Sequence, residues 1–423
     1  MSAPRARPRR AQAAASQRGG GGGSEPVRRL TAREARRLLG AYHFAPRRLG
    51  AAFEHLGTVQ YDPLNPLGRN PDLVLQARVP GYRVDGWQHL AYRRRRVYDA
   101  WDKQVCLTPV EDWPYRRIYH RHFRRRWGER VLDAYPEEVG LTLRQLERRG
   151  PLSSLDFADD LFDDHRPQAI RGSWYGDKLV KHILRGLWMS GEIVTHHRTK
   201  GRHVYDLPER VLPGDVLATP DPGETASLRY LLKRRVQSAG LLRPGAGAAV
   251  WSVPVDADRR RRALDDLLAE GALLSVEVEG EAFLAPPRAL EALEGATPRG
   301  MRFVAPLDGL LWDRRAVQRL YGFDYVWEVY KPEHERRWGY YVLPVWHRGR
   351  LVGRFDSRLE RDDGQATWRV ERFDWEGTPS AAALNALESA ARRFARYLGA
   401  HAVATGAGVD AATAAALAKG AEA

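Results

Sequence analysis

Cysteine is almost absent from the 423-residue sequence, and this scarcity excludes several classes of protein. Cys106 is the single cysteine, so the chain has no internal disulfide and no four-cysteine zinc or iron–sulfur site. No apolar run approaches the length of a membrane span, and the basic N-terminus lacks the apolar segment of a secretory signal. These absences predict a cytoplasmic protein with no membrane partner.

Lysine is also scarce, although the chain is strongly basic. The formal net charge is +15, and seven of the 68 basic residues are Lys. Residues 1–29 carry seven Arg and one Glu, which accounts for +6 of the charge and leaves +9 for the remainder. Arginine suits bidentate contacts with phosphates and base edges, so the excess favours a nucleic-acid partner. A GC-rich genome would give the same bias through its codons, and composition alone leaves both explanations open.

The N-terminal residues predict a tail followed by a folded domain. Residues 1–29 combine Pro, Arg, Ala and Gly with little hydrophobicity, so we expect a disordered basic tail. The sequence Thr31-Ala32-Arg33-Glu34 has the form of a capping box, which predicts that a helix begins there.

One supersecondary unit occurs twice in the middle of the chain. A helix near 178–189 ends at Gly191, and strands lie on both sides of Gly201; a helix near 259–269 ends at Gly271, and strands lie on both sides of Gly280. Helix, glycine, strand, tight turn and strand form the closing half of a winged helix. We expect helices at 141–149 and 152–157 before the first copy and one at 225–238 before the second.

The C-terminal third changes to strand-like runs at 325–331, 340–346, 350–356 and 366–373, which predict a small barrel closed by a helix at 381–397. The predicted fold class is therefore α+β, with three tandem winged helices followed by a C-terminal β-barrel. The N-terminal winged helix is expected by analogy, because its wing is not evident. The expected domains are a basic tail at 1–29, winged helices at 30–135, 136–218 and 219–298, the barrel at 299–398, and an Ala- and Gly-rich loosely ordered tail at 399–423.

Basic segments supply candidate contacts with DNA. The wing at 195–203 is basic to its tip, so Arg198, Lys200 and Arg202 are predicted to contact phosphates or the minor groove. Arg93, Arg94 and residues 233–235 are further candidates for phosphate contacts. Within 115–127, aromatic residues recur every four positions; this is typical of a buried helical stripe, with stacking on bases as the alternative.

Two groups of residues raise the question of a bound metal. His196, His197 and His203 share one wing, but strand alternation predicts that the first two point to opposite faces. The acidic run from Asp156 to His165 would suit a divalent ion in a nuclease, whereas a solvated loop is the ordinary explanation. We expect no metal site and no cofactor.

The segment from His55 to Asn65 contains the most informative pair of residues. Gln60 and Asp62 are two positions apart, so on an extended chain an amide and a carboxylate point to the same side. Such a pair can hold a water and stabilise a developing positive charge. Asp62-Pro63 is also an ordinary turn opener, and the local sequence does not decide between the two interpretations.

Several blocks, in one order, resemble the winged-helix DNA glycosylases of the AlkZ/YcaQ type, a bacterial crosslink-repair family, from about Leu30 to Leu398. These blocks are Val59–Asp62 with Asn70–Arg78, Trp101 with Cys106–Pro109, Val204–Leu207 with Arg210–Pro213, Leu307–Arg314, and Glu328–Asp356. The resemblance implies three winged helices and a C-terminal β-barrel around a basic DNA channel. It also places the family's catalytic motif, Gln-x-Asp in one branch, on Gln60-Tyr61-Asp62. The chain departs from the family at Tyr61, where an aliphatic residue is usual, and at Asp102-Lys103-Gln104.

The resemblance implies a monofunctional DNA glycosylase of base excision repair, which acts on alkylated purines of the N7-alkylguanine type, interstrand crosslinks included. Asp62 would stabilise the sugar cation and activate water, and Gln60 would orient that water. The expected partner is double-stranded DNA, bound by a monomer associated with the nucleoid. Three alternatives stay open: a winged-helix transcription regulator without activity, a metal nuclease, and a glycosylase-lyase that uses Lys103 or Lys178.

Overall fold

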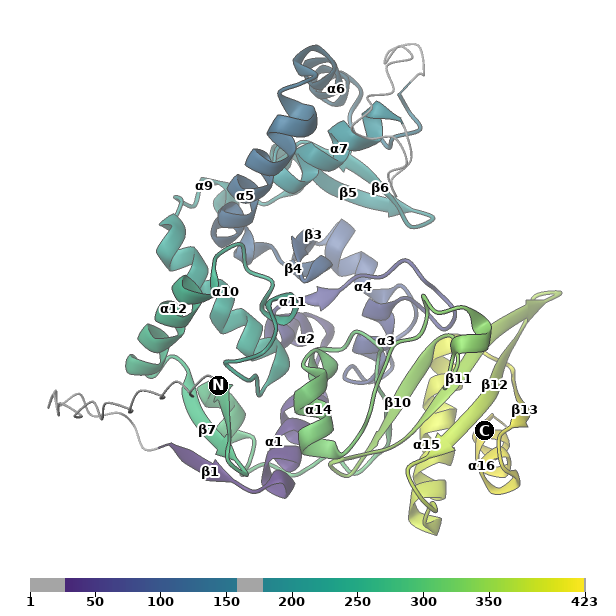
Figure 1. Ribbon diagram of the computed structural model, residues 1–423. Helices are drawn as coiled ribbons and strands as arrows, with labels where there is room; N and C mark the ends of the chain where they lie inside the picture. The colour runs from purple at the N-terminus through teal and green to yellow at the C-terminus, as the bar shows by residue number, and fades with distance from the viewer. Residues whose placement is uncertain (1–26, 158–177, 422–423) are drawn as a thin grey trace, which may run out of the picture.

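The computed structural model describes residues 27–157 and 178–421, which form a mixed α+β fold with small sheets (Figure 1). Two of the sheets have three strands, one has five and one has two. The predicted α+β class is confirmed. Within residues 27–157 and 178–421, no helix is both long enough and apolar enough to cross a membrane.

The N-terminal part contains a three-stranded sheet, whose first strand begins the Gln60 segment, residues 59–62. Thr31 caps the first helix through Glu34, as the capping-box sequence predicts. Strand β2 pairs with β4, and β4 pairs with β3 in a hairpin that turns at Lys103 and Gln104, where φ is +74° at Gln104. This hairpin was not evident in the sequence. The elements are α1 (Ala32–Phe44), α2 (Leu49–Leu56), β2 (Val59–Gln60), α3 (Asn70–Gln76), α4 (Gly86–Gln88), η1 (His89–Arg93), β3 (Val97–Asp102) and β4 (Gln104–Pro109).

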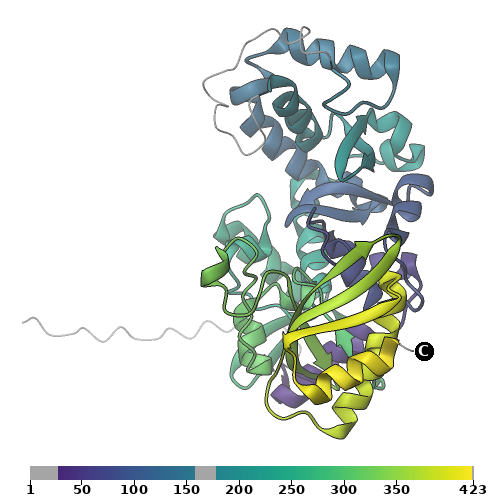
Figure 2. The same ribbon diagram turned by 90° about the vertical axis from the view of Figure 1, so that its right-hand side faces the viewer.

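The next part forms the upper end of the molecule in Figures 1 and 2. Helix α7 ends at Gly191, which adopts the left-handed conformation with φ +79°, and the β5–β6 hairpin follows as predicted. The helix expected at 152–157 is absent: Leu152 bridges to Tyr205, and Asp156 accepts hydrogen bonds from Ser153, so a turn forms. The elements are η2 (Val110–Arg116), α5 (Arg117–Trp127), η3 (Gly128–Leu132), α6 (Pro136–Arg149), α7 (Leu179–Ser190), β5 (Val194–Thr199), β6 (Arg202–Asp206), α8 (Pro208–Val211) and α9 (Gly214–Ala218).

A third part repeats the helix and hairpin arrangement. Asp256 caps α12, and the β7–β8 hairpin follows the turn after that helix. Strand β1 (Arg28–Leu30) pairs in parallel with β7, so Arg28 and Arg29 belong to a sheet rather than to the expected tail. The elements are α10 (Gly223–Ala239), α11 (Ala248–Trp251), α12 (Ala257–Ala269), β7 (Leu274–Val278), β8 (Glu281–Ala285) and α13 (Pro287–Glu291).

The C-terminal part is built on a five-stranded sheet in the order β13-β12-β11-β10-β9. No pairing within the described residues joins β9 to β13, so the sheet is open, unlike the expected closed barrel. Residues 325–331 do not form the expected strand, because buried Glu328 accepts hydrogen bonds from the backbone of Arg337 and Trp338 and folds the segment into a loop. The elements are β9 (Arg302–Phe303), η6 (Gly309–Leu311), α14 (Arg314–Tyr321), η7 (Glu333–Glu335), β10 (Val342–His347), β11 (Arg350–Asp362), β12 (Gln365–Trp375), α15 (Ala381–Leu398), β13 (Ala402–Gly408) and α16 (Ala411–Ala421).

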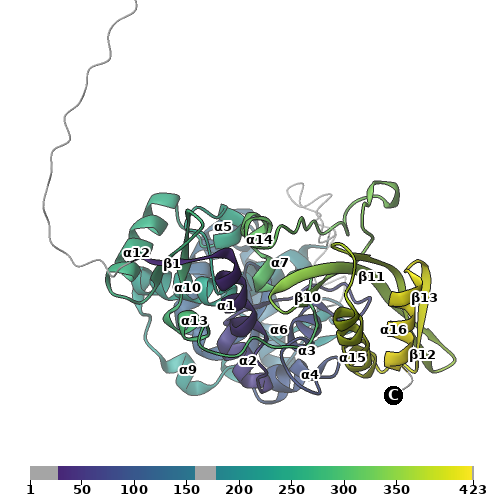
Figure 3. The same ribbon diagram turned by 90° about the horizontal axis from the view of Figure 1, so that it is seen from below.

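Residues 402–408 and 411–421 form a strand and a helix, which corrects the expectation of a loose tail in this region. Strand β13 extends the sheet through parallel pairing with β12, and α16 lies beside α15 (Figure 3). Small side chains allow this close approach, and Leu417 is fully buried. An Ala- and Gly-rich composition therefore did not mean a loose tail here, because the sheet edge and a neighbouring helix provide the contacts of this segment.

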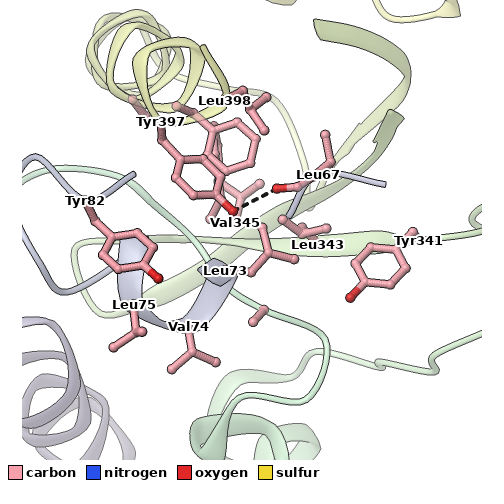
Figure 4. Close-up of a cluster of buried hydrophobic side chains, with 14 of the residues drawn as sticks. Leu67, Leu73, Val74, Leu75, Tyr82, Tyr341, Leu343, Val345, Tyr397 and Leu398 are labelled. Atoms are coloured by element: carbon pink, nitrogen blue, oxygen red, sulfur yellow. Dashed lines mark hydrogen bonds between the residues drawn. The ribbon is translucent and has the colours of Figure 1, made fainter. Parts of the chain in front are cut away.

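The largest core cluster joins segments that are far apart in the sequence. Leu67, Leu73 and Tyr82 from the N-terminal part pack with Tyr341 and Tyr397 from the C-terminal part (Figure 4). The Tyr397 hydroxyl donates a hydrogen bond of 2.8 Å to the Leu67 carbonyl oxygen. The segment after β2 is thus fixed against the C-terminal sheet and helix.

Candidate active site and DNA-contacting wing

The Gln60 segment is held in an extended conformation by hydrogen bonds on both sides. Gln60 lies opposite Cys106 in the β2–β4 ladder, and the Tyr61 amide donates to the Val105 carbonyl oxygen at 2.8 Å. The Asn70 side chain donates to the Gln60 carbonyl oxygen at 2.7 Å and accepts from the Leu307 amide at 3.1 Å. Asn70 therefore couples the strand to the C-terminal part. The sequence analysis missed this role, although Asn70 lies in one of the blocks of the resemblance.

Both proposed catalytic side chains are almost buried. Gln60 is 7% exposed and Asp62 is 9% exposed. One carboxylate oxygen of Asp62 accepts a hydrogen bond of 2.9 Å from the Leu64 amide, which fixes the side chain in a turn. Burial raises the pKa of Asp62, and the Leu64 hydrogen bond opposes this only in part. The carboxylate is thereby made a better base than a solvated one.

Gln60 has an acceptor atom that the protein does not use. Its side-chain oxygen is buried and has no hydrogen-bond partner among the described residues. A buried carbonyl without a donor is costly, and such atoms gather at functional sites. Side chains two positions apart on an extended segment point to the same side, and an amide oxygen and a carboxylate placed in this way could accept both hydrogens of a water molecule.

Tyrosines surround the side of the segment that carries Asp62. Burial, with the charge of Asp62 as a further cause, raises the pKa of both Tyr330 and Tyr341. The Tyr341 hydroxyl is buried without a hydrogen-bond partner in the described chain, whereas Tyr330 is 74% exposed. These residues follow the block that begins at Glu328. They give Asp62 aromatic neighbours and no cation that would neutralise its charge.

Tyr61 points away from this pair and toward the wing. The guanidinium carbon of Arg198 lies 3.8 Å from the centre of the Tyr61 ring, and Arg198 also forms an ion pair of 2.6 Å with buried Asp99. Tyr61 and Arg198 line a cavity of about 320 Å³, together with Arg202 and Arg185. The β5–β6 hairpin and the segment that holds the candidate catalytic pair are therefore in direct contact.

The five predicted DNA-contacting residues fall into two groups. Lys200 and Arg202 are exposed at the tip of the β5–β6 hairpin, and Arg93 and Arg94 are exposed at the end of η1. Arg198 is different: its side chain is 5% exposed and its charge is matched by Asp99. Alternation along the wing directs Arg198 inward, so its position does not suit the phosphate contact that was expected.

The basic run at 233–235 is also divided by the structure. Lys233 is exposed, but Arg234 pairs with Asp112 at 2.6 Å and Arg235 pairs with Asp102 inside the protein. Arg116 pairs with the same Asp102 at 2.7 Å. Asp102, one of the departures from the family pattern, is therefore the centre of a buried ionic network, and most of the basic run stabilises the interior.

The two metal hypotheses have different outcomes. His196 and His197 were expected to point apart, but the hairpin has a register shift between Thr195 and His197, and the two imidazoles approach to 2.8 Å between their Nδ1 atoms. Residues 27–157 and 178–421 contain no group of three or more His, Cys, Asp or Glu side chains arranged for a metal ion. Most of the acidic run from Asp156 to His165 lies outside the described residues; Asp156 itself caps the turn at Ser153.

The aromatic stripe at 115–127 is part of the core, as its spacing predicts. Tyr119 and Phe123 on α5 are buried in the cluster around α7.

Lys103, one of the two lysines considered for lyase chemistry, lies at the β3–β4 turn with its ammonium 6.0 Å from the centre of the Trp312 ring, and burial lowers its pKa. Lys178 is exposed at the start of α7.

Comparisons with known proteins agree with this geometry. Residues 53–397 match the family model described as DNA glycosylase AlkZ-like. The structure is similar to that of the Streptomyces sahachiroi DNA glycosylase AlkZ, with a TM-score of 0.60 and 16% sequence identity; the match covers 89% of this chain and 99% of that chain. The family match spans the Gln60 segment, the wing and the C-terminal sheet.

Proposed function

Because the chain belongs to the AlkZ-like family of DNA glycosylases, we propose that it hydrolyses the N-glycosidic bond of alkylated purines in double-stranded DNA, with Asp62 and Gln60 at the reacting centre. N7-alkylguanine is the proposed lesion type, interstrand crosslinks included. The observation that carries this proposal is the pair itself: within the described residues, a buried carboxylate that no cation neutralises lies two residues from a buried amide oxygen without a hydrogen-bond partner.

The chemistry requires little from the protein because an N7-alkylated guanine is already cationic. When the bond between the sugar C1′ and the base N9 breaks, its electron pair goes to the base and neutralises that charge. Positive charge then develops on the sugar, where the Asp62 carboxylate stabilises it. Water held by Gln60 and Asp62 adds to C1′ and gives its proton to Asp62, and an abasic sugar remains. The raised pKa of Asp62 favours this proton transfer.

We also propose that the hairpins β3–β4, β5–β6 and β7–β8 are the wings of three winged helices, within domains at 30–135, 136–218 and 219–298. Each hairpin follows helices of its own part of the chain. Lys200 and Arg202 at one wing tip, with Arg93 and Arg94, supply exposed positive charge for the DNA backbone. A transcription regulator without activity is not favoured, since the family is one of glycosylases.

The deciding experiment compares the wild-type protein with Asp62→Asn on duplex DNA that contains N7-methylguanine. Asparagine keeps an oxygen for the Leu64 amide but cannot accept the proton of water. Release of free base in single-turnover reactions should fall by about 10²–10⁴-fold, while duplex binding stays nearly unchanged. Wild-type rates in the variant would contradict the assignment of Asp62.

A further inference from the structure

A second cavity, of about 550 Å³, lies between the segment after α3, strand β9 and helix α15. Its lining includes no residue of the Gln60 segment or of the β5–β6 wing. Five arginines contribute to the walls: Arg78, Arg83, Arg302, Arg393 and Arg396. No carboxylate side chain is part of the lining, so arginines supply all the charged side chains of the cavity walls.

Two of these arginines converge on one neutral atom. Arg302 extends from β9 and Arg393 from α15, and their guanidinium groups donate to the same Met301 carbonyl oxygen at 3.1 and 3.0 Å. A carbonyl oxygen satisfies one donor of each group, whereas each guanidinium has five N–H donors. The other donors of each guanidinium are not used by this contact, so both groups retain N–H donors at the wall of the cavity.

Neither charge is compensated by a carboxylate among residues 27–157 and 178–421. In the part of the chain that the structure describes, no ion pair involves Arg302 or Arg393, whereas the neighbouring Arg78 is fully matched by Asp308 through two hydrogen bonds of 2.8 Å. Burial, then the charges of Arg393 and Arg78, lowers the pKa of Arg302 to about 10. Burial also lowers the pKa of Arg393. Arg302 is half-buried and Arg393 is exposed, so the uncompensated charge that destabilises the ligand-free protein is mainly that of Arg302.

The rest of the lining is apolar or aromatic. Met301, Phe303 and Tyr397 contribute side chains, and the rings of Tyr82 and Tyr397 lie stacked with 6.2 Å between their centres (Figure 4). An apolar wall beside a few convergent polar groups is the usual composition of a small-molecule site. The arginine pair matches the planar, bidentate recognition of phosphoryl oxygens.

We propose that this cavity binds a phosphoryl group, with Arg302 and Arg393 as its direct ligands and with the apolar wall in contact with the organic part of the ligand. The group is supplied either by a free organic phosphate or by the backbone of DNA. A concave site of this size suits the free compound better, since a duplex presents its phosphates on a convex surface. The proposal does not depend on the role of Asp62.

The test measures binding of inorganic phosphate and phenyl phosphate to the full chain by calorimetry and by thermal unfolding at constant ionic strength. Both ligands should raise Tm, and phenyl phosphate should bind more tightly because of the apolar wall. Arg302→Gln and Arg393→Gln should each weaken binding by about tenfold. Without ligand, Arg302→Gln should unfold at the same or a higher temperature than the wild type, because an uncompensated charge has been removed.

Arg392→Gln is the matched control. Arg392 is the neighbour of Arg393 on α15, pairs with Glu388 at 3.2 Å and does not line the cavity, so its replacement should leave phosphate binding unchanged. Duplex affinity, measured in the same variants, separates the sources. Phosphate binding together with unchanged duplex affinity identifies a free phosphate compound as the ligand, and a tenfold loss of duplex affinity in the Arg302 and Arg393 variants alone identifies the DNA backbone. Failure of both phosphates to bind, with unchanged duplex affinity, would overturn the proposal, as would equal losses in the Arg392 variant.

Discussion

The guanidinium of Arg198 lies against the Tyr61 ring, with 3.8 Å between the guanidinium carbon and the ring centre. Tyr61 stands between Gln60 and Asp62, and Arg198 belongs to the hairpin whose tip carries Lys200 and Arg202. The contact therefore connects the hairpin that we propose as a DNA-contacting wing to the segment that we assign to catalysis. The Arg198 guanidinium donates two hydrogen bonds, of 2.6 and 2.9 Å, to the Asp99 carboxylate, which holds it in place.

We predict that Arg198→Gln will lower both stability and excision. The substitution leaves Asp99 buried without its partner, which costs about 3–5 kcal/mol in the free energy of unfolding. Chemical denaturation measures this loss. Arg202→Gln is the control, because Arg202 is exposed on the same hairpin and its replacement should leave stability unchanged. Equal stability of the two variants would show that the ion pair with Asp99 is unimportant.

Asp62→Asn should make the protein more stable at neutral pH. The pKa of Asp62 is raised above 3.8 in the folded protein, so ionisation of this carboxyl lowers stability as pH rises through the raised pKa. Asparagine removes that cost, and Tm at pH 7 should exceed the wild-type value. At pH 3 the two proteins should unfold at nearly the same temperature. For the same reason, wild-type excision should decline as pH falls toward the raised pKa of Asp62.

Gln60→Ala should slow excision by roughly tenfold, less than Asp62→Asn, because one hydrogen bond to water is lost while the carboxylate remains. Single-turnover base release from the N7-methylguanine duplex measures the effect. Alanine also removes the buried side-chain oxygen that has no hydrogen-bond partner in the described chain. The free energy of unfolding should therefore fall by no more than the lost packing of the Gln60 side chain accounts for. A loss as large as that of Asp62→Asn would instead assign Gln60 a primary chemical role.

DNA affinity should fall steeply with salt concentration, since exposed arginines and lysines displace counterions from phosphates. Lys200→Gln and Arg202→Gln should each flatten the slope of log K against log salt by about 0.9 for a phosphate contact. Lys419→Gln is a useful control, because Lys419 is exposed on α16 and is not among the candidate DNA contacts. A wild-type slope near zero would contradict a charge-based mode of binding.

The reaction should leave an intact abasic site and should need neither an amine nucleophile nor a metal. Lys103 is the residue of concern, because burial lowers its pKa and it follows the buried Asp102. Borohydride treatment during the reaction should trap no protein–DNA adduct, and a chelator should not stop base release. An adduct that is lost in Lys103→Ala would establish lyase chemistry, and inhibition by the chelator would redirect attention to the acidic run from Asp156 to His165.

Sequence reasoning located the extended segment, the repeated helix and hairpin units, and the capped first helix, since each depends on residues close together in the chain. It predicted Arg198, Arg234 and Arg235 as DNA contacts, because a sequence shows which residues are charged but not which distant carboxylates form ion pairs with them. Asp99, Asp102 and Asp112 come from other strands and loops. The bulge that brings His196 to His197 and the pairing that orders 402–408 also depend on tertiary contacts.

Because the largest core cluster combines residues from the N-terminal and C-terminal parts, it limits how the polypeptide can be cut into fragments. Leu67 and Leu73 before residue 110 pack with Leu343 and Leu398 after residue 300, and Asn70 joins Gln60 to Leu307. A peptide that ends before β9 would carry Gln60 and Asp62 but would lack the wall against which they are held. Two fragments separated in the exposed connection after α13 would therefore be inactive alone, and activity would return only through their reassociation, as a case of fragment complementation.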